Sequence, residues 1–381
     1  MMKTTILTAA TVVSALIGPA IAQEKTLTGD RPLVFAHRGA SGYLPEHTLE
    51  AYKLGIEMGA DFIEPDLVCT RDGVLIARHE PMLSGTTDVA DRPEFASRKR
   101  TRKVDGVDTT DWFAGDFTLT EIKQLRAKQA MADRDQSKNG QFQIPTLQEV
   151  IDLVKAESRA RGRTIGIAPE TKHPTFHAAL GLPLEERLIE ILRASNWTDR
   201  SAPVVVQSFE VANLKHLRTR IGVRLAQLIS AGNVDKDGNI VLEAPNAQPY
   251  DFVVIGDKRT YKDLLTKDGL AEVKSYADIL APWKPYILAS KQVDKNNDTK
   301  PDDLNGDGKM DEQDRVIAEP SSVVKDAHAA GLQVVTWTFR SEPKRLASSF
   351  KGDPTAEYKA FYALGIDGLF SDFPDIAAKA R

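Results

Sequence analysis

Residues 33–52 read LVFAHRGASGYLPEHTLEAY and contain one complete strand-turn-helix pattern. The apolar run 33–36 is followed by a glycine-containing turn, and apolar residues at helical spacing begin after Thr48. This order predicts a β-strand followed by an α-helix. His37 and Arg38 stand directly after the strand, where turn residues alone are usual. Their position makes them candidates for chemistry rather than for packing.

Apolar runs of strand length recur along the rest of the chain and mostly alternate with helical patterns. The predicted strands are residues 33–36, 61–68, 164–168, 203–207, 223–228, 276–281, 332–338 and 366–370. The predicted helices include residues 48–58, 146–160, 183–194, 261–274 and 321–330. Such alternation indicates parallel pairing, and eight βα units closed on themselves form a TIM barrel. A doubly wound α/β sheet would show the same alternation, but the count of eight favours the (β/α)8 barrel.

Two polar segments lengthen the chain beyond the usual barrel, which needs about 250 residues. Residues 81–143 form an insertion after the second strand, and residues 291–315, rich in Asp, Asn and Gly, form one after the sixth. Loops of this length are commonly functional or disordered. The basic run RKRTRK at 98–103 is interpreted as a solvated loop.

The N-terminal residues 1–22 have the pattern of a secretory signal. Lys3 is followed by an uncharged run, and the small residues Ala20 and Ala22 suit cleavage before Gln23. A retained membrane anchor is the alternative, and Pro19 with the moderate hydrophobicity favours cleavage. We therefore expect a mature chain of residues 23–381, periplasmic or secreted and without stable membrane insertion. The net charge of −4 gives no indication of nucleic-acid binding.

Polar residues cluster where the first three predicted strands end. The second strand carries Glu64 and Asp66, two residues apart and therefore on one side of an extended segment. Glu170 and Lys172 repeat this spacing after the third strand. His79 ends a hairpin predicted around the turn Arg71–Gly73. In a barrel these strand ends share one face, where active sites are built.

The residue types at this face suit metal-assisted displacement at phosphorus. Burying a carboxylate costs free energy unless it is paired or binds a metal. Glu64, Asp66 and Glu170 offer hard oxygen ligands of the kind that hold Ca²⁺ or Mg²⁺. Arg38 and Lys172 could bind a phosphate, and His37 and His79 could transfer protons near neutral pH. Taken singly, each residue is more commonly structural, so the inference rests on their joint placement.

The sequence also resembles the glycerophosphodiester phosphodiesterase family, and in particular its periplasmic bacterial branch. The resemblance extends from residue 33 to residue 375. It is carried by AHRGASGYLPEHTLEAY, GADFIEPDLVCTRDGVLIARHEP, PETKHP, QSFE, YADILAPWK, VVTWTFR and GIDGLFSDFPD.

The resemblance implies a TIM barrel with an insertion after the second strand. It also implies a divalent metal on Glu64, Asp66 and Glu170, for which Ca²⁺ is our first expectation and Mg²⁺ the alternative. His37 and His79 would then be the acid/base pair, with Arg38 assisting at the phosphate. Glu80 stands where many relatives have Asp.

The predicted reaction releases glycerol 3-phosphate and an alcohol such as choline or ethanolamine from a small-molecule glycerophosphodiester. One alternative is a phospholipase-type relative acting on lysolipids, which would need an exposed apolar rim. A second is a non-catalytic calcium-dependent binding protein, against which the presence of both histidines argues. The oligomeric state does not follow from the sequence.

The insertion at 291–315 contains a second candidate metal site. Its residues fit the spacing of an EF-hand-type loop in which Gly308 takes position 6. Positions 1, 3, 5, 7, 9 and 12 are then Asp303, Asn305, Asp307, Lys309, Asp311 and Asp314. Lys309 would contribute only its carbonyl, and position 12 is Asp instead of the usual Glu. We predict a structural Ca²⁺ here, with a solvated acidic loop as the alternative.

Three further residues receive weaker predictions. Phe209 follows the predicted strand 203–207, and Trp337 lies on the predicted strand 332–338. Each could bind substrate or belong to the core. His47 precedes the helix-capping candidate Thr48 and is expected to be structural.

Overall fold

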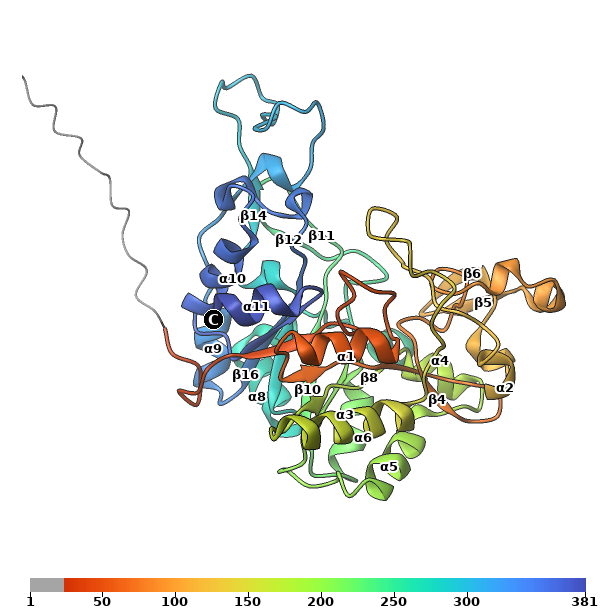
Figure 1. Cartoon of the computed structure of the whole chain (residues 1–381). Coiled ribbons are helices and arrows are strands. Elements are labelled where there is room, and N and C mark those ends of the chain that lie inside the picture. The colour runs from red at the N-terminus through yellow and green to blue at the C-terminus, as the bar shows by residue number, and fades with distance from the viewer. Residues whose placement is uncertain (1–23) are drawn as a thin grey trace, which may run out of the picture.

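The computed structural model describes residues 24–381 (Figure 1). The predicted signal at 1–22 lies outside the described residues, so export stays a prediction. Within residues 24–381, no helix has both the length and the hydropathy needed to cross a bilayer.

The core of the molecule is a closed barrel of parallel strands. Their bounds are β1 Leu33–Ala36, β2 Phe62–Ile63, β3 Asp66–Cys69, β7 Gly166–Ile167, β8 Glu170–Thr171, β9 Val205–Ser208, β10 Arg224–Ile229, β13 Ile279–Pro282, β16 Gln333–Phe339 and β17 Gly368–Ser371. β2 and β3 are successive parts of the second barrel strand, and β7 and β8 of the third. Parallel pairing runs in chain order around the barrel, and β17 pairs with β1. The predicted TIM barrel is confirmed.

Helices cover the outside of this barrel, except that α2 belongs to the insertion after the second strand (Figure 1). Their bounds are α1 Leu49–Glu57, α2 Leu119–Ile122, α3 Leu147–Arg161, α4 Pro174–Ala179, α5 Leu184–Ala194, α6 Val211–Arg218, α7 Tyr250–Ile255, α8 Lys267–Tyr276, α9 Val323–Ala329, α10 Pro354–Ala363 and α11 Pro374–Ala380. Short 3₁₀ turns are η1 Val89–Asp91, η2 Pro93–Arg98, η3 Ala114–Asp116, η4 Asp263–Leu265, η5 Lys284–Tyr286, η6 Glu312–Asp314, η7 Pro343–Arg345 and η8 Ser348–Phe350.

Sequence-encoded caps fix where several helices begin. Thr48 accepts from the backbone N–H of Ala51, and Thr146 forms a reciprocal capping box with Glu149. Each such cap typically contributes about 1 kcal/mol, because it satisfies a helix N–H that has no intrahelical partner. The barrel interior is apolar, and the rings of Phe35 and Phe62 stack there at 4.7 Å. This packed interior leaves chemistry to the ends of the strands.

The second and third strands are interrupted, which the sequence pattern did not predict. The predicted strand 61–68 is divided between β2 and β3 at Glu64 and Pro65, and the third strand breaks before Glu170 at Ala168 and Pro169. Proline has no N–H to donate to a sheet ladder, so both breaks fall at a proline. Each interruption lies beside a carboxylate of the predicted metal site.

The predicted boundary between the sixth strand and its preceding helix was wrong. Helix α8 begins only after its cap Thr266 and continues to Tyr276, which we had placed in the strand. The strand itself begins at Ile279. Because Tyr276 is buried on the helix, its apolar character was misread as the start of the strand.

The insertion after the second strand begins beyond the antiparallel β4 Leu75–Ala77 and has an apolar cluster of its own, which includes Phe95, Trp112 and Phe117. β5 Arg100–Val104 and β6 Val107–Asp111 form an antiparallel hairpin within it (Figure 1).

The interpretation of residues 98–103 as a loop was wrong, although most of the run is exposed to solvent as expected. Most of this basic run forms β5 and pairs with β6. Arg98 and Arg102 form ion pairs with Glu121 and Asp116 at 2.5 and 2.6 Å. Carboxylates distant in the sequence therefore neutralise the run.

Two smaller hairpins lie after later barrel strands. β11 Asn233–Val234 and β12 Ile240–Val241 enclose an Asp-Gly turn at 237–238. β14 Ser290–Gln292 pairs with β15 Arg315–Ile317 and closes the base of the acidic loop.

Candidate active site

The three predicted metal ligands converge at the carboxyl end of the barrel. Glu64 follows β2, and Asp66 and Glu170 are paired in register at the start of β3 and β8. One ligand oxygen from each lies within 4.8 Å of the others, and all three side chains are buried. Within residues 24–381, no other group of three His, Cys, Asp or Glu residues converges in this way.

The charges in this group disfavour full ionisation without a cation. Burial and the charges of Asp66 and Glu170 raise the pKa of Glu64 well above its usual value. Burial, with the charge of Asp66 and against that of Lys172, raises the pKa of Glu170 to about 7. Oδ1 of Asp66 is buried and has no hydrogen-bond partner among residues 24–381. An unpartnered carboxylate oxygen between two further acids fits a hard divalent cation such as Ca²⁺ or Mg²⁺.

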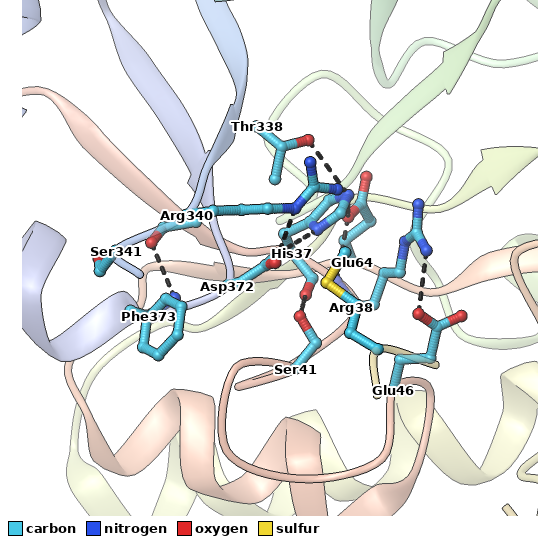
Figure 2. A network of polar contacts seen from close by, with 12 residues as sticks. His37, Arg38, Ser41, Glu46, Glu64, Thr338, Arg340, Ser341, Asp372 and Phe373 are labelled. Atoms are coloured by element: carbon cyan, nitrogen blue, oxygen red, sulfur yellow. Dashed lines mark hydrogen bonds and ion pairs between the residues drawn. The ribbon is translucent and has the colours of Figure 1, made fainter. Parts of the chain in front are cut away.

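His37 lies against this group and is oriented by Asp372 (Figure 2). Its Nδ1 is 2.5 Å from Oδ1 of Asp372, and its Nε2 is 3.8 Å from Oε2 of Glu64. Burial and the charge of Arg38 lower the pKa of His37 to about 4. A neutral ring that donates its Nδ1–H to Asp372 keeps a lone pair on Nε2, facing the carboxylate group.

His79 has a similar arrangement beside Lys172, which pairs with Glu170. Its Nδ1 lies 2.8 Å from Oε1 of Glu80, and its Nε2 lies 3.2 Å from Nζ of Lys172. Burial and the charges of Arg38 and Lys172 lower the pKa of His79 to about 3. Both imidazoles therefore have one nitrogen held by a carboxylate and the other turned inward.

Two cations complete the predicted set. Nη1 of Arg38 is 2.9 Å from Oε2 of Glu46, and its backbone N–H donates to Oε2 of Glu64 at 3.1 Å (Figure 2). Nζ of Lys172 is 2.9 Å from Oε1 of Glu170. Cationic groups beside clustered carboxylates can bind the non-bridging oxygens of a phosphate diester.

A cavity of about 250 Å³ contains this constellation. The predicted substrate-binding residues Phe209 and Trp337 also line it, with their rings edge to face at 5.7 Å. His47 lies behind it, fully buried, with Nε2 3.1 Å from Oδ2 of Asp66 and Nδ1 2.7 Å from the Tyr52 hydroxyl. His47 thus orients a predicted metal ligand.

Sequence reasoning missed several residues of the site. Asp372 follows β17, Arg340 follows β16 with its Nε 3.1 Å from Asp372, and Gln207 on β9 donates to Oε1 of Glu64 at 2.6 Å. All lie at carboxyl ends of barrel strands, so the rule applied to the first three strands could have found them. Arg134, which is 2.5 Å from Asp372, comes from the insertion and had no such signal.

The acidic loop holds its side chains in local hydrogen bonds. Oδ2 of Asp303 accepts from the N–H of Gly308 at 2.8 Å, and Oδ1 of Asp307 accepts from Lys309 at 2.8 Å. Asp314 accepts from the backbone of Leu304 at 2.8 Å, which connects the two ends of the loop. A second Ca²⁺ in this loop stays a prediction.

Calcium titration followed by Tm checks that prediction. We expect Ca²⁺ to raise the Tm of the wild type by about 2 °C or more through this loop. Asp303→Asn combined with Asp307→Asn should remove that part of the increase and leave turnover intact. Asp235→Asn with Asp237→Asn makes the same charge change in the β11–β12 turn and should behave as wild type. An unaltered calcium response in the loop variant would count against the site.

Comparison with known proteins assigns a family to this geometry. The model of the glycerophosphoryl diester phosphodiesterase family matches residues 37–376. A glycerophosphodiester phosphodiesterase of Arabidopsis thaliana is 35% identical over 367 residues, covering 92% of this chain and 86% of the relative. One of Haemophilus influenzae is 28% identical, covering 90% of this chain and 88% of the relative.

Solved structures show the same fold. A putative glycerophosphoryl diester phosphodiesterase of Silicibacter pomeroyi gives a TM-score of 0.57 at 19% identity, covering 94% of this chain and 95% of its own. An Oleispira antarctica phosphodiesterase in complex with the product sn-glycerol-3-phosphate gives 0.52 at 21% identity, covering 93% and 99%. With the family model matching nearly the whole described chain, this hydrolase belongs to the glycerophosphoryl diester phosphodiesterase family.

Proposed function

We propose that this glycerophosphodiester phosphodiesterase releases sn-glycerol 3-phosphate and an alcohol by histidine acid/base catalysis beside a carboxylate-bound divalent cation. The observation that supports it is that His37 and His79 line one cavity together with Glu64, Asp66 and Glu170. When bound there, Ca²⁺ or Mg²⁺ would supply Lewis-acid stabilisation of phosphate charge and lower the pKa of the attacking oxygen.

The residues of the chain bind the phosphate and transfer the protons. Arg38 and Lys172 bind and orient the phosphate oxygens in the cavity that both residues line. One histidine, neutral and with a lone pair on Nε2, takes the proton of the attacking oxygen. The other enters the step as the imidazolium, a form that the adjacent anionic phosphate favours, and gives its Nε2 proton to the departing alcohol. Asp372 stabilises the imidazolium form of His37, and Glu80 that of His79.

Two routes are compatible with this division of roles. The 2-hydroxyl of the substrate glycerol can attack phosphorus to form a cyclic phosphate, which water then opens with the histidine roles reversed. Alternatively, water attacks directly in one displacement. A substrate lacking the 2-hydroxyl distinguishes them, because only the direct route would still hydrolyse it.

The experiment that tests the function measures glycerol 3-phosphate release from a panel of glycerophosphodiesters. We expect turnover that is lost on chelation and restored by Ca²⁺ or Mg²⁺. The panel includes lysolipids, because α7 exposes Val253, Val254 and Ile255 and could contact an acyl chain. Faster turnover of lysolipids would favour the phospholipase-type alternative, and binding without turnover would favour a calcium-dependent binding protein.

We also infer that the chain belongs to the periplasmic bacterial branch and is exported. The support for this is the signal-like pattern of residues 1–22 and the motif blocks. The plant relative is 35% identical and the bacterial one 28%, so the assignment to the bacterial branch rests on the sequence patterns and not on these identities.

A further inference from the structure

A second cavity, of about 380 Å³, adjoins the catalytic cavity. The residues that line both are His79, Glu170, Lys172, Phe209 and Trp337. A phosphate diester has two arms on phosphorus. A phosphate bound between the two histidines can therefore place one arm in this second cavity, which we call the headgroup cavity. Its role rests on the proposed function.

Aromatic side chains make up much of the wall of the headgroup cavity. Phe209, Tyr250, Tyr261 and Trp337 all line it. The ring of Phe209 meets Trp337 at 5.7 Å and Tyr261 at 6.2 Å, both edge to face. The faces of such rings attract ammonium groups, and an apolar aromatic surface also accommodates N-methyl groups.

Carboxylates supply negative charge to the same cavity. Asp105, Glu80 and Glu210 line it together with His173. His173 lies between two of them, with Nδ1 2.7 Å from Asp105 and Nε2 3.0 Å from Glu80. Although burial favours the neutral ring, Asp105 and Glu80 raise the pKa of His173 to about 9. One imidazolium thus offsets two carboxylates, and a net negative charge remains.

The other charged groups of the cavity leave this balance in place. The charge of Lys172 is paired with Glu170 at 2.9 Å, at the boundary with the catalytic cavity. Burial raises the pKa of Glu210 to about 8, so this carboxyl is mostly neutral at pH 7. Glu80 also holds His79 and cannot be changed without affecting catalysis. Asp105 is therefore the charged residue that can be tested separately.

Asp105 reaches the cavity from the insertion. It occupies the turn between β5 and β6, with a left-handed φ of 44° and Gly106 beside it at 84°. Two residues of positive φ form the tight turn that Asp-Gly and Asn-Gly favour. Oδ1 of Asp105 has no hydrogen-bond partner in the described part of the chain, where His173 contacts only Oδ2 of this carboxylate.

We propose that the headgroup cavity binds a leaving alcohol that carries an ammonium group, and that Asp105 determines the preference for cationic over uncharged alcohols. The insertion after the second strand would thereby set substrate specificity, while the barrel strands supply the chemistry.

The test compares kcat/KM for glycerophosphocholine and glycerophosphoethanolamine with that for glycerophosphoglycerol. We expect the wild type to prefer the two cationic substrates. Asp105→Asn should lower that preference by about tenfold, since it removes a charge near the bound ammonium group. The loss should fall on the cationic substrates and leave glycerophosphoglycerol nearly unchanged. Asn accepts a left-handed φ as readily as Asp, so the turn is retained.

Asp108→Asn is the matched control, because it removes the same charge from the same hairpin. Asp108 pairs with Lys103 at 3.1 Å on the outer surface, and the two side chains are 68% and 59% exposed. This variant should keep the wild-type preference. Tyr250→Phe should also keep it, whereas Tyr250→Leu should lower it by removing one aromatic wall.

The outcomes separate this proposal from the proposed function. A wild type that hydrolyses the diesters without preferring cationic ones would overturn only the headgroup proposal. An unchanged preference in Asp105→Asn would do the same, as would an equal loss for all substrates, which would indicate an effect through His173, Glu80 and His79. A wild type that hydrolyses none of the diesters would instead refute the proposed function.

Discussion

Replacing His37 or His79 by alanine is expected to lower kcat for glycerophosphodiester hydrolysis by about 10²–10⁴-fold. Each ring has its Nδ1 held by a carboxylate and its Nε2 turned toward the acidic group. Without either ring, one of the two proton transfers passes to water, which no side chain holds in position. Binding of the cation should be largely retained, because neither histidine belongs to the convergent carboxylates.

The control for this pair is His216→Ala. His216 lies on α6, is 45% exposed as a side chain, and pairs only with Glu186 at 2.9 Å among the residues that the structure describes. It should have wild-type kcat and KM. Steady-state rates of glycerol 3-phosphate release, measured with saturating Ca²⁺, provide the comparison. Full turnover in both His37→Ala and His79→Ala would show that the acid/base assignment is wrong.

The strand pattern was sufficient to predict the barrel and the carboxylates at its mouth. Glu64, Asp66 and Glu170 could be placed together because parallel strands bring their carboxyl ends to one face. The break at Pro65 was missed because the apolar residues on both sides of it read as one strand over 61–68. The continuation of the third strand beyond Pro169 was missed because β8 consists of the polar residues Glu170 and Thr171. These breaks do not move the acids apart: Asp66 still pairs in register with Glu170.

Partners contributed by distant segments were not found from the sequence. Asp372 meets His37 only because the last strand pairs with the first, and it is 335 residues away in the chain. Arg134 and Asp105 come from an insertion whose path depends on its own apolar cluster. No local pattern encodes such contacts, although the closing of the barrel predicts that the last strand's end lies beside the first.

Substituting Glu64 by glutamine is expected to abolish most of the activity while leaving the fold intact. A bound cation stabilises the transition state by several kcal/mol, so its loss should lower the rate by about 10³-fold. The substitution removes one of three convergent carboxylates, so a divalent cation loses both a ligand and a counter-charge. Chelation of the wild type should produce a similar loss, and re-adding Ca²⁺ or Mg²⁺ should restore the wild type only.

Stability should change in the opposite direction from activity. Burial and two neighbouring acids raise the pKa of Glu64, so its ionised form is disfavoured in the metal-free protein and a neutral amide is tolerated there. The new NH₂ group also has an available acceptor, because Oε1 of Gln207 has no hydrogen-bond partner and a rotated Gln207 amide could present it. We therefore expect a Tm in EDTA equal to or above that of the wild type.

Measuring Tm in EDTA beside kcat in Ca²⁺ separates loss of the metal site from loss of the fold. Glu190→Gln on α5 makes the same chemical change at an exposed position and should alter neither quantity. A Glu64→Gln variant that retained full chelator-sensitive activity would show that the cation binds elsewhere. A large fall in Tm would show that the carboxylate is held by hydrogen bonds to Gln207 and Arg38 as part of the fold, and the rate loss could then no longer be attributed to the metal.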